Sequence, residues 1–328
     1  MTGQTTTRRV TAADVARSLG LSRATVGFVL NRTPGQTIPE ATRARVLAEA
    51  ERLGYRPNTA AQALARGRSS IALLVLPDWP VDFALRVNLE EAGLLLDRAG
   101  YSLVTQTHHP EGRARPLWQT LQPEVVLGML PFGADEVAAI RAAGVPHVIT
   151  SPQDQAPADM PGVGEGVRAQ VRHLAGRGHR TLGYARTDDP RLAWLQRHRS
   201  EAARRECDAL GLPAPVEHAV GRTDGTAALD AWRAAGVTAV AAYNDECAAT
   251  VVGAAVRRGW SVPGDLAVVG HDDSPLARLM LPSLSSARID QASLGRYTAE
   301  LILDAVGALG RDVAPPDPRV EVVVREST

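Results

Sequence analysis

The pattern of apolar and polar residues changes character near residue 70. Before that point, apolar residues recur at helical spacing in three short segments, 12–19, 23–30 and 39–53. After it, apolar runs of strand length alternate with segments of helical spacing. The expected strands are 71–77, 101–107, 125–130, 145–150, 181–185, 237–242, 266–270 and 320–324. Strands that alternate with helices are typical of parallel sheets with helices on both faces, so the pattern predicts a helical head followed by α/β lobes.

Two such lobes are expected, because the alternation runs through two successive series of strands. The helices expected between the strands span 83–99, 134–143, 167–175, a long segment ending near 210, 227–234, 246–257 and 294–309. Open parallel sheets bind ligands at the carboxyl ends of their strands. Two neighbouring lobes therefore predict a ligand-binding cleft between those ends.

The three helical segments of the head have the caps and the turn of a helix-turn-helix. Thr11 is suited to cap the first helix, which ends at Gly20, and Ser22 is suited to cap the second. Pro39 begins the third helix and Gly54 ends it. Two short helices around a glycine-containing turn form the unit that places its second helix in the DNA major groove. A plain three-helix bundle is the alternative interpretation.

Charge is segregated along a chain whose formal net charge is zero. Residues 1–68 contain eleven arginines and four acidic residues, which gives this part a charge of +7 and leaves −7 on the rest of the chain. The chain has no lysine, so all of these basic residues are arginines, whose planar guanidinium suits phosphates and guanine edges. A basic head joined to an acidic body is the asymmetry expected of a nucleic-acid-binding module attached to a second module.

Composition narrows the class of protein further. The 328 residues are 45% hydrophobic and 22% charged, a globular balance, and two cysteines are too few for a disulfide framework. No apolar run is long enough to span a membrane, and the first ten residues lack the apolar stretch of a secretory signal, so a cytoplasmic protein is expected.

Motifs of catalysis are absent from the sequence. It has no phosphate-binding loop, no GxSxG nucleophile elbow and no HExxH zinc motif, and its histidines lack metal-ligand spacing. We therefore expect no catalytic residues, no metal and no cofactor.

Long stretches of the sequence resemble a known family. The first two read VTAADVARSLGLSRATVGFVLN and IPEATRARVLAEAERLGYRPNTAAQALARGRSSIALLVLPD. In this order and spacing they resemble the amino-terminal region of the lac-repressor (LacI/GalR) family of bacterial transcription regulators. Later segments, among them AAYNDECA and VPGDLAVVGHDDSPLARLMLPSLSSARID, match in the expected order. The resemblance implies a helix-turn-helix DNA-binding head and an α/β, two-lobed effector domain like the periplasmic sugar-binding proteins.

The resemblance also implies how the head reads DNA. Arg23, Ala24 and Phe28 match positions that contact bases, and the Arg23 guanidinium is suited to guanine. The matched positions that contact phosphates hold hydroxyl or amide side chains, and they are Thr11, Ser22, Thr25 and Asn31. Gly27-Phe28 departs from the polar pair usual in the family, which leaves the operator sequence open. Alternatively, Phe28 turns toward the core or a partner.

Residues 58–70 are expected to join the head to the body as a hinge. Thr59–Ala65 is compatible with a helix but too short to hold one in water by itself. By resemblance it is a hinge helix that folds on DNA. Leu64 matches a leucine wedged into the minor groove, and Asn58 and Ala61 are expected DNA contacts beside it. An ordinary linker is the alternative, although only 66–70 has such a composition.

Four polar residues of the body match positions that bind the effector in relatives. Asn244 and Asp245 directly follow one expected strand, Asp272 follows another, and Arg199 lies on the long helix. A carboxylate, an amide and a guanidinium offer the donors and acceptors that a hydroxyl-rich ligand needs. The alternative for each is an end-of-strand cap or a salt bridge. If the register differs, the arginine is a neighbour on the same helix, Arg197 or Arg204.

The first lobe departs from the family after its opening strand. Asp78, Trp79 and Phe83 follow this strand and are expected to line the cleft, where Trp79 stacks on a sugar face. Packing at the hinge is the alternative for Trp79 and Phe83. In the second lobe, the position that is often aromatic falls near Thr223. The expected effector is therefore the family default, a sugar or a sugar derivative.

The expected domains are a head over 1–57, a hinge over 58–70 and a two-lobed body over 71–328. Lobe one is expected to span about 71–160 with a crossover segment near 275–290, and lobe two about 161–274 and 290–328. The chain past Leu309 has no heptad repeat, so no coiled-coil tetramerisation helix is expected.

Together these features predict a homodimeric regulator that binds a pseudo-palindromic double-stranded DNA operator. A small molecule bound between the lobes would control its operator affinity, and repression is the expected sense of regulation. An activator or dual regulator of the same family is one alternative. The other, from a different class, is a small-molecule binding protein without a regulatory role.

Overall fold

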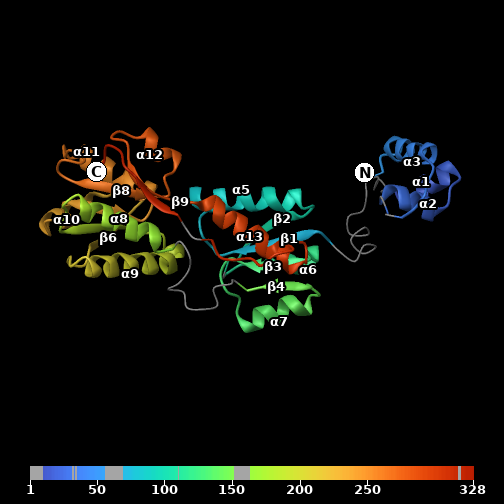
Figure 1. Cartoon of the computed structure of the whole chain (residues 1–328), viewed down its shortest axis with the longest axis horizontal. Coiled ribbons are helices and arrows are strands. Elements are labelled where there is room, and N and C mark those ends of the chain that lie inside the picture. Colours follow the sequence, from blue (N-terminus) through green and yellow to red (C-terminus); the bar gives the residue numbers. More distant parts are fainter. Residues whose placement is uncertain are drawn as a thin grey trace, which may run out of the picture. The chain divides into compact units, whose positions relative to one another are not determined.

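The chain divides into two compact units, Met1–Ser70 and Ile71–Thr328. The computed structural model describes residues 10–31, 33, 35–55, 69–109, 111–150, 163–316 and 319–328. The first unit contains the helical head and the second contains the two-lobed body (Figure 1). The predicted fold class, a helix-turn-helix head plus a two-lobed α/β body, is confirmed.

Three helices form the head: α1 (Ala12–Leu19), α2 (Arg23–Leu30) and α3 (Glu40–Arg52). Each contributes fully or almost fully buried residues to one apolar core, and these are Val15, Ala16, Val26, Val29, Val46 and Ala50. In α2 and α3 these residues lie three or four positions apart, and in α1 the partly buried Ala12 and Leu19 lie four positions from Ala16 and Val15. This is the apolar periodicity that predicted these helices.

Short polar side chains fix where the helices of the head begin. Thr11 and Asp14 form a capping box, in which the Thr11 hydroxyl accepts from the Asp14 N–H and the Asp14 carboxylate accepts from the Thr11 N–H. The Ser22 hydroxyl accepts from the Thr25 N–H at 3.0 Å and so caps α2. Between them, Gly20 ends α1 at φ 65°, in the left-handed region that favours glycine.

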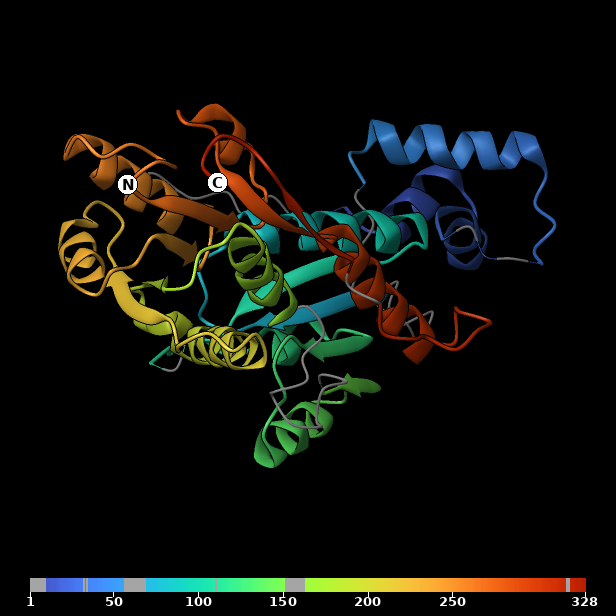
Figure 2. The same cartoon turned by 60° about the vertical axis from the view of Figure 1, so that its left-hand side comes forward.

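Lobe one is built on a four-stranded parallel sheet in the order β2-β1-β3-β4. Its strands are β1 (Ile71–Leu76), β2 (Ser102–Thr107), β3 (Val125–Gly128) and β4 (His147–Ile149). Helices α5 (Phe83–Arg98) and α13 (Gln291–Ala305) pack on one face, and α6 (Leu117–Leu121) and α7 (Ala134–Ala142) on the other (Figures 1 and 2). Consecutive residues of β1 face opposite cores, because Leu74 packs with α5 whereas Leu73 packs with α6.

Lobe two is built on a six-stranded sheet in the order β10-β9-β8-β7-β5-β6. Its strands are β5 (Leu182–Thr187), β6 (Val216–Val220), β7 (Ala239–Ala242), β8 (Ala267–His271), β9 (Ser285–Ile289) and β10 (Val320–Val323). All pair in parallel except β10, which runs antiparallel to β9 and closes one edge.

Helices cover both faces of the second sheet as well. They are α8 (Glu165–Gly176), α9 (Ala193–Ala209), α10 (Thr226–Ala234), α11 (Asp245–Arg257) and α12 (Pro275–Leu279), and a 3₁₀ turn, Pro190–Leu192, precedes α9. Helices α8 and α9 pack on one face, and α10 and α11 on the other. Residues of β7 again alternate between the two faces of the sheet. Ala239 and Ala241 face the core under α8 and α9, and Val240 and Ala242 face the core under α10 and α11.

The predicted division of the lobes is wrong in its crossover segment. Residues 275–290 were expected in lobe one, but β9 pairs with β8 and therefore belongs to lobe two. The segment that returns to lobe one is α13. It packs along α5, and Ala299 and Ile302 are buried with the β1–β3 core. Burial of this apolar face decides the lobe to which α13 belongs.

No helix among the described residues is long and apolar enough to cross a membrane.

Candidate functional site

Helix α2, the predicted recognition helix, presents a polar and an apolar face. Val26 and Val29 are buried in the core of the head, whereas Arg23 and Ala24 are exposed to solvent. Thr25, which shares a hydrogen bond between hydroxyls with Ser22 at 2.8 Å, is half-buried at the start of the helix. The base-reading positions predicted at the amino-terminal end of α2 are therefore accessible.

Phe28 is half-buried on α2, but it lies outside the apolar core formed by the described residues of the head. Neighbouring Leu30, by contrast, packs against that core. The alternative that Phe28 turns inward therefore finds no support in these contacts. Its ring is available to thymine methyl groups or to a partner surface.

The positions expected to contact phosphates gather at helix ends. Exposed Thr11 and Ser22 cap the starts of α1 and α2, and half-buried Asn31 ends α2. Helix starts carry unpaired N–H groups and a partial positive charge, which favours phosphate oxygens. The predicted hinge residues Asn58, Ala61 and Leu64 lie outside the described residues.

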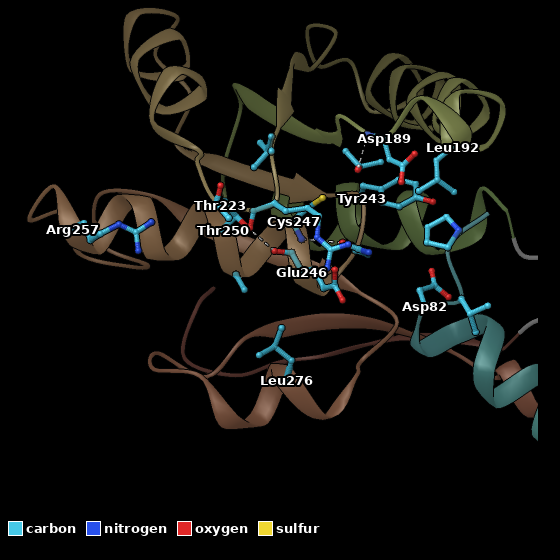
Figure 3. A pocket seen from close by; sticks show the side chains of 18 residues that line it. Asp82, Asp189, Leu192, Thr223, Tyr243, Glu246, Cys247, Thr250, Arg257 and Leu276 are labelled. Carbon is cyan, nitrogen blue, oxygen red and sulfur yellow. Dashed lines mark hydrogen bonds between the residues drawn. The ribbon is translucent and has the colours of Figure 1, made fainter. Parts of the chain in front are cut away.

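Residues of both lobes line a cavity of about 500 Å³ in the body (Figure 3). Lobe one contributes Pro80, Val81 and Asp82, which follow β1. Lobe two contributes the carboxyl ends of β5, β6 and β7 together with the first turns of α11. Among the predicted residues, Asn244 lines this cavity, and Thr223 lies in its wall. The position of the cavity agrees with the cleft expected at the ends of parallel strands.

A second cavity adjoins the first one, and a third adjoins the second. A cavity of about 170 Å³ shares Asp82 and Asn244 with it and is also lined by Phe83, Asp245 and Asp272. A cavity of about 760 Å³ lies on the other side of Phe83 and Asp272. Asp272 therefore lines both of these cavities, although the residue is only 6% exposed.

Arg199 is buried behind the wall of the cleft. Its guanidinium donates to the Tyr243 carbonyl at 2.6 Å and stacks 4.6 Å from the centre of the Tyr243 ring. Burial alone would lower the pKa of Arg199, but Tyr243 and Asp272 raise it, so the group stays charged. The two alternatives differ, since Arg197 is exposed and Arg204 pairs with Glu217 at 2.6 Å. Arg199 thus places a fixed positive charge beneath the cleft.

Asp272 directly follows β8 and has an unusual conformation. Its φ of 95° lies in the left-handed region, and its N–H donates to the Ala287 carbonyl at 2.8 Å. One carboxylate oxygen accepts from the His271 ring at 2.7 Å. Burial tends to raise the pKa of Asp272, but His271 and Arg199 outweigh it, so the pKa falls below its ordinary value and the carboxylate stays ionised.

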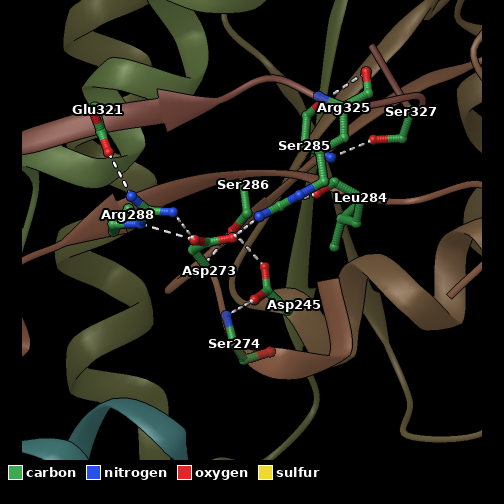
Figure 4. A network of polar contacts seen from close by, with 10 residues as sticks. All are labelled: Asp245, Asp273, Ser274, Leu284, Ser285, Ser286, Arg288, Glu321, Arg325 and Ser327. Carbon is green, nitrogen blue, oxygen red and sulfur yellow. Dashed lines mark hydrogen bonds and ion pairs between the residues drawn. The ribbon is translucent and has the colours of Figure 1, made fainter. Parts of the chain in front are cut away.

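Asp245 faces a polar network inside lobe two (Figure 4). Its carboxyl accepts from the Ser286 hydroxyl at 2.6 Å and from the Ser274 N–H at 2.6 Å. Burial raises the pKa of Asp245 to about 6, although these two hydrogen bonds lower it. Both of its oxygens are already held, so Asp245 fixes the β8–α12 loop against β9.

Trp79 packs between the lobes, as the hinge-packing alternative expected. It contacts the apolar core of lobe two, and its ring stacks on Trp194 with centroids 6.1 Å apart. Trp79 is not among the residues that line the three cavities described here. Asp78 pairs with His109 at 3.0 Å on the lobe-one side. Phe83, in contrast, lines two of the cavities.

Several cleft residues were missed by the sequence analysis. Asp82 lines the cleft and caps α5 by accepting from the Leu85 N–H at 2.9 Å. Burial, aided by the charge of Asp272, raises the pKa of Asp82 above its ordinary value. Tyr243 and Glu246 flank the Asn244-Asp245 pair and also line the cavity. Asp82 had a signal in the sequence, because an aspartate directly before a helical apolar pattern is an N-cap pattern.

The head and cleft together define a class of protein, the DNA-binding transcription regulators with a ligand-binding body. A family model described as "Bacterial regulatory proteins, lacI family" matches residues 11–58, and a "Periplasmic binding protein-like domain" model matches residues 171–328. The chain is 33% identical to the HTH-type transcriptional regulator MalR of Streptomyces coelicolor, with 96% of both chains covered. It is 32% identical to the HTH-type transcriptional regulator reg1 of Streptomyces lividans, again with 96% of both covered. The chain belongs to the lacI family of bacterial regulatory proteins.

Solved structures share this fold. The lac repressor dimer bound to operator and the anti-inducer ONPF superposes with a TM-score of 0.77 at 23% identity, covering 98% of this chain and 99% of the other. The transcriptional regulator CelR in complex with cellobiose superposes with a TM-score of 0.60 at 24% identity, covering 98% and 100%. Members of this family are transcription regulators rather than enzymes, so the prediction of no catalytic activity is confirmed.

Proposed function

We propose that this protein is a homodimeric repressor whose affinity for a pseudo-palindromic operator is controlled by a sugar or sugar derivative bound between the lobes. The observation that carries the proposal is the cavity of about 500 Å³ that both lobes line in a chain with an accessible recognition helix. A ligand that contacts both lobes binds one relative arrangement of them better than another and shifts the population toward it.

The chemistry of the cleft supports a hydroxyl-rich effector. Asp272 is an ionised acceptor, the Asn244 side chain can still donate, and Asp82 and Glu246 add further acceptors. The Asn244 carbonyl oxygen is occupied, because it accepts from the Cys247 N–H at 2.9 Å and caps α11. Its amide nitrogen is therefore the group that faces a ligand. Sugars are recognised by such fixed donors and acceptors, and CelR, a relative in fold, is described as bound to cellobiose.

The head supports recognition of a two-fold operator. One recognition helix with exposed Arg23 and Ala24 reads only a half-site, and two copies read the two halves of a pseudo-palindrome. In this proposal the hinge segment 58–70 folds on the operator and inserts Leu64 at its centre. Effector binding changes the spacing of the two hinges and so lowers operator affinity.

Selection of binding sites from random duplex DNA, with full-length protein at one fixed salt concentration, tests the DNA-binding half of the proposal. The expected result is one pseudo-palindrome with a discrete centre. Enrichment of no sequence at all, with only salt-sensitive binding, would contradict an operator-specific regulator. A single unpaired half-site would contradict the dimer.

A release assay on the selected operator tests the effector half. A panel of glucose, galactose, maltose, cellobiose and their phosphates is added to the complex, and operator affinity is measured for each. A repressor with a sugar inducer loses affinity with at least one of them, whereas a corepressor raises it. Placing the operator over and then upstream of a promoter separates repression from activation, because an activator raises transcription from the upstream site whereas a repressor does not.

A further inference from the structure

His271, the last residue of β8, is an unexpected polar residue at the edge of the cleft. Its side chain is fully buried, and its Nδ1 lies 2.7 Å from Oδ1 of Asp272. An ionised carboxylate only accepts hydrogen bonds, so the proton must lie on Nδ1. His271 therefore donates to a carboxylate that lines two cavities.

The other ring nitrogen of His271 is closed off. Nε2 is buried and has no hydrogen-bond partner among the described residues. It faces Gly166 in the first turn of α8, where a Cβ atom would overlap the imidazole ring. Protonation would bury an N–H without an acceptor, which is unfavourable. Packing against Gly166 therefore favours the neutral form of the His271 imidazole and fixes the orientation of the ring.

The charges around the ring favour the same state. Burial lowers the pKa of His271, and the positive charge of Arg199 lowers it further, while Asp272 acts in the opposite direction. Other packed elements bring charges that are already paired: α8 carries the Glu165–Arg168 ion pair, and α11 carries Asp245, which is held by serine donors. His271 is therefore a neutral donor to an ionised carboxylate.

We propose that His271 is a positioning residue of the effector site. It holds Oδ1 of Asp272 so that Oδ2, which has no hydrogen bond from the described residues, is the oxygen presented to a ligand hydroxyl. Because Gly166 has no side chain, the His271 ring fits against the first turn of α8. The position of α8 thereby affects the Asp272 carboxylate, which contacts the ligand in this proposal. The inference rests on the proposed function, in which Asp272 binds the effector.

Nuclear magnetic resonance of the full-length protein, labelled with ¹⁵N in its histidine rings, tests the hydrogen bond without any ligand. His271→Gln identifies the His271 signals by their loss. The expected signals are those of a neutral Nδ1–H tautomer that does not titrate between about pH 5.5 and 8, and Asp272→Asn shifts them. An Nε2–H tautomer, or titration near the ordinary pKa of about 6.5, overturns the proposal.

Three variants test the positioning role in operator release by the sugars of the panel. His271→Phe removes the donor and is expected to raise the sugar concentration for half-release by about tenfold or more, the worth of a charge-assisted hydrogen bond. His271→Asn keeps an N–H near the position of Nδ1 and should stay within about threefold of wild type. Gly166→Ala displaces the ring and should behave like His271→Phe.

Gly176→Ala is the matched control, because this glycine ends the same helix α8 and a Cβ there meets nothing within 4 Å. Thermal melts followed by tryptophan fluorescence establish that each variant is folded. If Asp272→Ala leaves release unchanged, the proposed effector site is wrong, whatever the state of His271. If Asp272→Ala abolishes release but His271→Phe matches wild type, the positioning role is overturned.

Discussion

At the residue scale, the effector response is expected to depend on Asp272. Its carboxylate is ionised and lines two cavities, each of which has residues of both lobes in its wall. Asp272→Ala removes this acceptor and should abolish operator release by the effector while operator affinity stays within about threefold of wild type, as expected for a residue outside the head. Asp230→Ala, which breaks a surface pair with Arg258, is the control. A normal effector response in Asp272→Ala contradicts this site.

Asp245 predicts a pH dependence of stability. Its pKa is about 6 in the folded body against 3.8 for the free side chain, so between these values the folded state binds more protons. Stability therefore falls as pH rises from about 4 to about 6, and the raised pKa corresponds to a cost on the order of 3 kcal/mol at neutral pH. Asp245→Asn should lack this decline, although it also weakens the hydrogen bond from Ser274.

Denaturant unfolding at a series of pH values measures the difference between wild type and Asp245→Asn. All five tryptophans lie in the body, so their fluorescence reports this unit alone, and they are Trp79, Trp118, Trp194, Trp232 and Trp260. The free energy of unfolding of wild type, relative to that of Asp245→Asn, should fall as pH rises from about 4 to about 6. A constant difference from pH 4 to 7 would mean that Asp245 titrates at its ordinary pKa.

Residue types at strand ends were predictable, but their chemical roles were not. The positions of Asn244 and Asp272 after their strands follow from the apolar runs before them. Whether a carboxylate faces the cleft or the interior depends on serines distant in sequence, as Ser286 and Asp245 show. The role of His271 depends in the same way on Gly166, about a hundred positions earlier.

At the element scale, the hinge segment couples the head to DNA deformation in the proposed mechanism. Leu64→Ala removes the predicted wedge and should weaken binding to the selected operator by about tenfold or more, because the wedge favours a kinked centre. Binding to random-sequence DNA depends on phosphate contacts and should change little. Leu47→Ala, at a leucine of α3 that is 50% exposed, is the control in the same head. Equal losses on both DNAs would argue against a wedge.

Elements with a regular apolar pattern were predicted well, and two strands were missed for physical reasons. Strand β9 begins with Ser285 and Ser286, which are fully buried although they are polar. Hydrogen bonds to Asp245, Arg325 and Ser327 satisfy them, so no apolar run marks the strand (Figure 4). Strand β6 lies at the sheet edge, where only Val220 is buried and polar residues interrupt the run.

At the scale of the whole molecule, the return of the chain from lobe two to lobe one through α13 links lobe one to the cleft. The chain leaves β9 in lobe two and enters α13 in lobe one within a residue or two of Asp290. Asp290 caps α13, and the loop that contains it also lines the cavity beside Asp272. This connection could not be read from the sequence, because hydrophobic spacing predicts helices and strands but not the sheet against which each one packs.

The proposed dimer predicts an interface on lobe two near α12. Leu279 and Leu281 are 79% and 86% exposed at the end of this short helix, an unusual exposure for two neighbouring leucines. An aspartate at either position would bury an unpaired charge if the two copies meet there. Leu281→Asp should therefore convert a concentration-independent dimer into a monomer at micromolar protein in sedimentation equilibrium. The monomer should keep its tryptophan fluorescence and lose most of its operator affinity, because a single head contacts only one half-site.

Leu210→Asp, at a leucine that is 42% exposed after α9, is the control and should leave the dimer intact. A Leu281→Asp protein that remains dimeric would place the interface on another face of the body.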